Sequence, residues 1–196
     1  MRAIAERAGV SLGSSYHYFP SKEHLVLEFY RHTHELHLQV VGQLLAREKD
    51  LAARLRGVIR AVVVTCEPFH AVAGSIFSTV ANPASPLNPF GPTSKPLRDE
   101  VIALYAEVVN GSDARIQADL AAELPMLMWL YQMGILYFWI FDRSPGRLKT
   151  LEVIDQTGDL IVRLIGLANL PVLRSPRKRM LALIRSIAEG SLGPAG

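Results

Sequence analysis

The stretch IAERAGVSLGSSYHYFPSKEHL, residues 4–25, decides the fold of this chain. Its apolar residues recur at spacings of three and four, which is typical of helices. We expect one short helix over residues 2–8, followed by a turn at Gly9. A second short helix is expected over residues 12–18, because Pro20 ends it. The stretch therefore predicts two short helices joined by a glycine turn.

The remainder of the chain keeps the helical spacing and lacks strand signals, so we expect an all-α fold. A long helix is expected from Lys22 to about Arg47, because the Ser21 hydroxyl can accept a hydrogen bond from an otherwise unpaired N–H of its first turn. Further helices are expected over residues 51–68, 69–80, 97–109, from about 114, and over 125–141 and 145–168. The side chains expected to face inward on the first and the long helix are Ile4, Ala8, Leu25, Phe29, Leu36 and Val40.

Residues 82–96 interrupt this pattern with five prolines in 15 residues and are expected to form a loop. Connections this long are uncommon inside compact domains and are usually functional or mobile. The predicted organisation is a helix-turn-helix head over residues 1–38, a helical effector-binding and dimerisation domain over 39–172, and a basic C-terminal tail over 173–196.

The composition is that of a globular protein, with 49% hydrophobic residues in 196 and a net charge of +3. This charge tolerates nucleic acid as a partner without requiring it. A single cysteine, Cys66, forms no internal disulfide, and we expect a cytoplasmic protein. The basic residues of the tail are expected to be solvated, with contact to DNA as the alternative; they are Arg174, Arg177, Lys178, Arg179 and Arg185.

The segment PMLMWLYQMGILYFWIF, residues 125–141, is apolar on almost every side and must be buried in protein or in lipid. Its 17 residues reach only the lower end of the range for a membrane span, and Gln132 interrupts them. We therefore expect a buried core helix and no membrane association.

The two short helices at the N-terminus form a helix-turn-helix arrangement, whose second helix lies in the major groove of DNA. Gly9 suits the left-handed backbone that the turn requires. The residues expected to face the bases are Ser11, Leu12, Ser14, Ser15 and His17. The residues expected to hold phosphates are Tyr16, Tyr18 and Lys22, which offer two phenol donors and an ammonium at a helix N-terminus.

Residues 4–25 resemble the core of the DNA-binding domain of TetR-family transcriptional regulators. About 25 positions carry the resemblance, and the later helices agree with the family in number and length alone. The matching positions, in order, are Ile4, Ala5, Ala8, Gly9, Val10, Ser11, Gly13, Tyr16, Tyr18, Phe19, Ser21, Lys22, Glu23 and Leu25.

The resemblance implies an all-helical homodimer that binds operator DNA and releases it when a small molecule occupies the helical body. It assigns the phosphate and base contacts to the residues named above, and the dimer interface to residues of about 118–143 and 145–168. We expect a repressor.

The family also has a helix that precedes this motif, and Met1 falls where that helix has already ended. Two interpretations follow. Either the protein starts upstream of this chain, or the chain is a small-molecule-binding helical dimer that has lost DNA binding.

An aromatic and methionine-rich stretch is expected to line a pocket for a planar apolar effector, although core or dimer packing explains much of the same pattern. The residues predicted to face the cavity are Phe77, Trp129, Met133 and Tyr137. The possible polar anchors are Gln132, Asn110 and Thr79.

Other functions have weaker support in the sequence. His34 and His37 lie three apart on one helix face, but solvated or packed histidines are favoured over a metal site, and Cys66 is expected to pack rather than to sense redox. No nucleophile is paired with a base and no phosphate loop is present, so we expect neither an enzyme nor a cofactor. A scaffold that only dimerises is the third functional class. A ligand that raises the thermal stability of the protein would distinguish a ligand sensor from such a scaffold.

Overall fold

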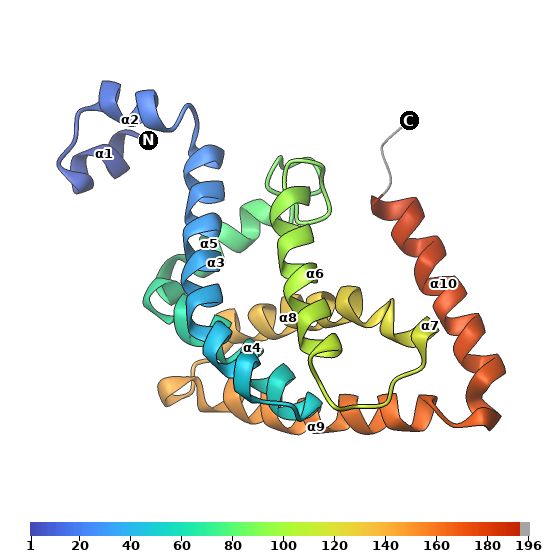
Figure 1. Cartoon of the computed structure of the whole chain (residues 1–196). Helices are drawn as coiled ribbons and strands as arrows, with labels where there is room; N and C mark the ends of the chain where they lie inside the picture. Colours follow the sequence, from blue (N-terminus) through green and yellow to red (C-terminus); the bar gives the residue numbers. More distant parts are fainter. Residues whose placement is uncertain (193–196) are drawn as a thin grey trace.

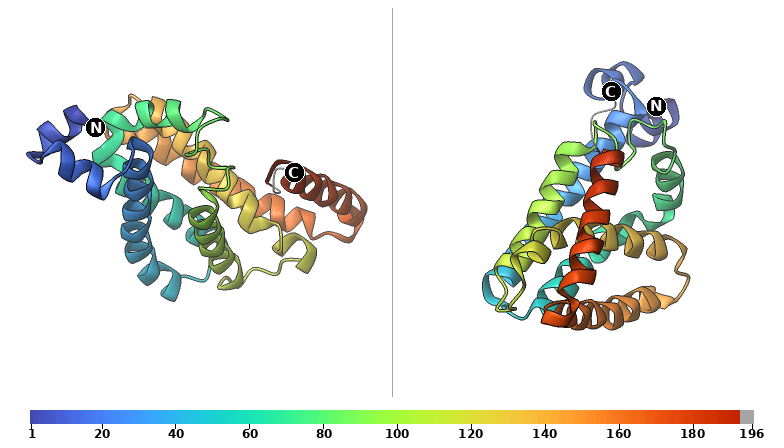
Figure 2. Two further views of the ribbon diagram at one scale, coloured as in Figure 1. Left: turned by 90° about the horizontal axis from the view of Figure 1, so that it is seen from above. Right: turned by 90° about the vertical axis from the view of Figure 1, so that its right-hand side faces the viewer.

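The computed structural model describes residues 1–192, with side chains described through residue 186, and these residues form helices and no strand. The head consists of α1 (Arg2–Ala8) and α2 (Leu12–Tyr18), and α3 (Lys22–Arg47) leads from it into the body. The body contains α4 (Leu51–Cys66), α5 (His70–Val80), α6 (Lys95–Asn110), α7 (Ala118–Ala121), α8 (Leu124–Phe141), α9 (Leu148–Ala168) and α10 (Arg174–Leu192). Figure 1 shows the head at one end and α10 at the other, and the view from above in Figure 2 agrees.

Local sequence signals determine where several of these helices begin or end. Ser21 caps α3 by accepting a hydrogen bond from the His24 amide, as predicted, and Asp50 caps α4 in the same way through the Ala53 amide. Gly9 ends α1 in the left-handed conformation with φ 67°, where a side chain would be strained. The predicted helices and the proline-rich connection are therefore present.

Helix α4 lies at the centre of the core, packed against α3, α6 and α9. Leu55, Val58 and Ile59 on it are fully buried. Its ion pairs Arg56–Asp159 and Arg60–Asp155 hold α9, and the two helices approach closely because Gly158 has no side chain to meet Arg56.

Arg54 of α4 is also buried, at 1% exposure, and ties together the ends of two other helices. Its guanidinium donates to the carbonyls of Leu45 and Glu48 at the end of α3, and to those of Glu107 and Val108 at the end of α6. Helix C-terminal carbonyls lack partners within their own helix and carry partial negative charge, so one buried cation serves both termini.

The face of α3 that is buried differs from the prediction. Thr33, His34 and His37 are buried with Val41 and Leu45, whereas the predicted inner residues Leu36 and Val40 are exposed. On α1 the buried residue is Ala5, and the predicted Ile4 and Ala8 are exposed. In both helices the contacting element selects the buried face: α4 and α6 pack on α3, and α2 packs on α1.

The segment expected to be a solvated basic tail begins as helix α10, which packs on α7. Arg177 is buried, donates to Asp119 at 3.2 Å and to the Ala168 carbonyl, and Leu181 is 2% exposed. Arg185 pairs with Glu123. Two of the basic residues therefore hold the helix in place, because acidic partners lie far from them in sequence and close in space. The last ten residues of the predicted tail lie outside the residues whose side chains are described.

Two segments are long and apolar enough to cross a membrane by length and composition, Leu51–Val80 and Leu124–Phe141. The core helix of a soluble protein passes the same test. In α8, the buried Gln132 accepts a hydrogen bond from Tyr105 of α6 at 2.7 Å, which gives this polar side chain a partner inside the protein.

Candidate functional site

The head presents a polar surface at the end of the molecule. Ser14, Tyr16, His17, Tyr18 and Lys22 are all exposed, with Tyr18 at 75%. Lys22 is the first residue of α3, where the helix dipole favours anions. These side chains are therefore accessible to a phosphate backbone or to base edges, and the Ser14 hydroxyl oxygen also accepts a hydrogen bond from the Ser11 hydroxyl at 2.9 Å.

Three of the residues predicted to face bases are engaged within the head. Ser15 is 9% exposed and donates to the Ser11 carbonyl, so its assignment as a base-facing residue is wrong: it lies on the inner face of α2. Ser11 caps α2 by accepting from the Ser14 amide at 3.0 Å, and Leu12 is half-buried. A serine before a short helix caps it more readily than it faces outward.

A cavity of about 530 Å³ lies in the body, within the size range of small-molecule sites. Its wall is mostly apolar and is built from α3, the end of α4, α5, the loop before α6, α6 itself and α8. All four residues predicted to face a cavity line it, namely Phe77, Trp129, Met133 and Tyr137. The rings of Phe77 and Tyr137 lie 4.9 Å apart.

The polar anchors are only partly those expected. Gln132 lines the cavity, but Asn110 and Thr79 do not. His34, His37 and Arg98 also line the cavity and were not predicted to do so. Their positions depend on which face of α3 and α6 turns inward, and single-helix patterns do not carry that information.

Burial favours the neutral form of both cavity histidines, because it lowers their pKa values. Burial lowers the pKa of His34, although Glu100 at 3.6 Å and Glu35 act in the opposite direction. Burial also lowers the pKa of His37, whose Nε2 lies 2.9 Å from the Val58 carbonyl oxygen. In the part of the chain that the structure describes, no group of three or more His, Cys, Asp and Glu side chains is placed to hold a metal.

Cys66 also lines the cavity and is half-buried. Burial raises the pKa of its thiol to about 11. The thiolate is the reactive form, so this environment favours packing over redox chemistry.

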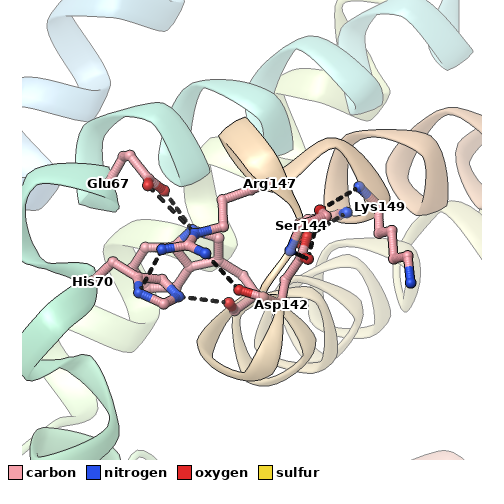
Figure 3. Close-up of polar contacts among 8 residues, drawn as sticks. Glu67, His70, Asp142, Ser144, Arg147 and Lys149 are labelled. Atoms are coloured by element: carbon pink, nitrogen blue, oxygen red, sulfur yellow. Dashed lines mark hydrogen bonds and ion pairs between the residues drawn. The ribbon is translucent and has the colours of Figure 1, made fainter.

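A polar network lies beside the cavity and joins α5 to the turn between α8 and α9 (Figure 3). The indole N–H of Trp139, a cavity residue, donates to Glu67 at 2.9 Å, and the Arg147 guanidinium lies 3.4 Å from Glu67. Arg147 also donates to Nδ1 of His70, whose Nε2 lies 3.0 Å from the Trp139 carbonyl oxygen. Because arginine cannot accept a hydrogen bond, His70 carries its proton on Nε2.

Asp142 anchors the start of α9 in the same region. Its carboxylate accepts hydrogen bonds from the amides and hydroxyls of Ser144 and Thr150. Burial alone would raise the pKa of Asp142, but these hydrogen bonds outweigh burial and lower it. The turn after α8 is therefore fixed to the first turn of α9.

Helices α8 and α9 also carry exposed apolar side chains outside the cavity. On α9 these are Leu160, Leu164 and Leu167, at 52–54% exposure and helical spacing. On α8 Phe138 and Phe141 are exposed, the latter at 59%. A row of exposed leucines at helical spacing on α9 offers an interaction surface.

Two family models match the chain. Residues 54–177 match the family described as Tetracyclin repressor-like, C-terminal domain, and residues 1–29 match the one described as Bacterial regulatory proteins, tetR family. The chain belongs to the TetR family. The resemblance found in residues 4–25 is thereby confirmed. No curated protein matches the chain.

TetR-family membership, with the helix-turn-helix head, identifies a DNA-binding transcriptional regulator. The predicted all-α fold, a helix-turn-helix head followed by a helical C-terminal domain, is confirmed as well. The match points to a regulator rather than to an enzyme.

Proposed function

We propose that this TetR-family chain is a ligand-responsive repressor that binds operator DNA as a homodimer and releases it when an apolar molecule fills the cavity. The observation that carries the proposal is the course of α3. Its first residue, Lys22, follows the head directly, and its middle, including Tyr30, Thr33 and His34, lines the cavity. One continuous helix therefore links the two sites.

The proposed switch is a shift between two positions of α3. A ligand that binds one position more tightly shifts the population toward it. In a dimer, two recognition helices must be spaced to match one turn of DNA, so a small movement of each α3 changes the fit. Asp142 and Arg147 anchor the α8–α9 turn, and Arg147 also ties α5 to it through His70, which supports α3 as the movable wall.

The proposed dimer surface is the apolar face of α8 and α9, in the ranges 118–143 and 145–168 expected from the resemblance. Leu160, Leu164 and Leu167 supply one stripe and Phe138 and Phe141 another. Burial of these side chains against a second copy would remove them from water. We further propose that the regulator acts in the cytoplasm, where operator DNA is available.

Fluorescence anisotropy with the DNA upstream of the coding region, measured across a salt series, tests DNA binding. Binding with a steep loss of affinity at higher salt supports the proposal. A folded dimer that binds no upstream DNA at low salt would contradict it and favour the ligand-binding dimer without a DNA function.

A further inference from the structure

Arg98 is a buried cation in the cavity wall. It is 6% exposed, lies in the first turn of α6 and lines the cavity. One of its terminal nitrogens donates to the carbonyls of Pro89 at 2.6 Å and Gly91 at 3.3 Å. Among the described residues, its Nε and other terminal nitrogen make no hydrogen bond but are not fully enclosed by protein, and no carboxylate pairs with the guanidinium. Buried charges are rarely left without a counter-charge.

The other two arginines buried among the described residues are held differently, and neither lines the cavity. Arg54 donates through all three of its nitrogens to four carbonyls. Arg177 donates to the Asp119 carboxylate and to a carbonyl. Arg98 alone of these three faces a cavity with donors to spare.

The surroundings of Arg98 favour an anion. Ser94, which precedes α6, makes no side-chain cap to this 16-residue helix and lines the cavity beside Leu97. The positive end of the helix dipole therefore lies at the same wall as the guanidinium. None of the described residues that line the cavity is Asp or Glu.

We propose that the cavity binds an apolar anion, a carboxylate with a hydrocarbon or aromatic body, whose head pairs with Arg98. The inference rests on the proposed function for the cavity itself and adds the chemical class of its ligand. Two parallel N–H donors of one guanidinium match the two oxygens of a carboxylate. The body of the ligand lies along Trp129, Met133 and Tyr137.

The site also ties the ligand to the loop before α6. Arg98 holds the carbonyls of Pro89 and Gly91, and Phe90 between them packs edge-on against Trp129 with ring centroids 5.3 Å apart. The carboxylate uses the free donors of Arg98, so the loop contacts remain in place when the ligand is bound.

The test compares decanoate with 1-decanol, which share a chain length and differ in charge, below the concentrations at which either aggregates. Both compete with the neutral fluorescent probe N-phenyl-1-naphthylamine on the full chain. We expect decanoate to bind at least about tenfold more tightly than 1-decanol. Arg98→Gln should abolish the preference, and Arg98→Lys should retain part of it.

Lys95→Gln is the matched control, because it removes a positive charge from the same helix at an exposed position that pairs with Asp99. It should leave the preference unchanged. If Arg98→Gln does not fold, the affinities of decanoate and 1-decanol are compared in the unmodified protein and in Arg98→Lys. That comparison still tests whether the cavity prefers an anion and whether Arg98 sets the preference.

Equal binding of decanoate and 1-decanol by the unmodified protein would overturn the anion inference and leave the ligand-binding cavity intact. Retention of the full preference by Arg98→Gln would overturn the role of Arg98. Failure of the neutral probe itself to bind would contradict the cavity function on which the inference rests.

Discussion

At the scale of single residues, Ser14 and Lys22 are predicted to contact different parts of DNA. Lys22 offers a charge to phosphates, whereas the exposed Ser14 hydroxyl can contact base edges. We predict that Lys22→Ala weakens binding to all sequences alike and reduces the salt slope by about 1. Ser14→Ala should instead change the preferred sequence. Anisotropy against operator and scrambled duplexes checks both.

Lys49→Ala is the control for charge alone, because Lys49 is exposed just beyond the far end of α3. It should leave DNA affinity close to that of the unmodified protein. A Ser14→Ala variant that weakens every duplex equally would contradict the assignment of Ser14 to base contact.

Arg54 is the residue on which the junction of α3, α4 and α6 depends. We predict that Arg54→Met lowers the free energy of unfolding by about 3 kcal/mol or more, because several buried carbonyls lose their donor at once. Urea unfolding measures the change. Arg47→Met, at an exposed position in the last turn of α3, should cost less than about 0.5 kcal/mol. Similar losses in the two variants would contradict this role.

At the scale of elements, α3 should make stability depend on pH. The pKa values of His34 and His37 are lowered in the folded state, so the unfolded chain binds protons first as the pH falls. The contribution of the two histidines to the free energy of unfolding is therefore fully present above the histidine pKa of the unfolded chain, near 6.5. It is lost as the pH falls below that value, by up to about 1.4 kcal/mol per histidine per pH unit.

Urea unfolding between pH 7.5 and pH 5 measures this slope. The double variant His34→Gln/His37→Gln should have a shallower slope, and His32→Gln, at an exposed position on the same helix, should keep the original one. An unchanged slope in the double variant would show that groups other than His34 and His37 cause the loss of stability at acidic pH.

The sequence predicted the elements well and their partners poorly, for a physical reason. The start of α3 follows from the Ser21 cap and the turn after α1 from Gly9, and both signals act over a few residues. The inward face of α3 is set by α4 and α6, so the burial of His34 was not predictable from spacing.

The candidate site shows the same division. Trp129, Met133 and Tyr137 were predicted because an aromatic stretch on one helix must pack against something. Arg98 and Phe90 were missed, because only the folded loop brings Phe90 to Trp129 of α8 and gives Arg98 its carbonyl partner at Pro89.

At the scale of the whole molecule, the account requires a dimer. We predict that Leu164→Glu raises the dimer dissociation constant by about 30-fold or more, because charged groups replace apolar contacts within the proposed interface. Analytical ultracentrifugation measures the constant. Leu183→Glu, at an exposed leucine of α10 outside the proposed surface, is the matched control and should remain dimeric. Dissociation by Leu183→Glu alone would move the interface to α10.

If α3 couples the DNA head to the cavity, as we propose, the two tryptophans of the chain report on it. Trp129 and Trp139 both line the cavity and are 3% exposed. The decisive measurement is their emission, excited at a wavelength that DNA does not absorb, during titration with the upstream operator. We predict an emission change that saturates together with the anisotropy and is absent in Tyr18→Ala. Saturating anisotropy with unchanged tryptophan emission would contradict the coupling.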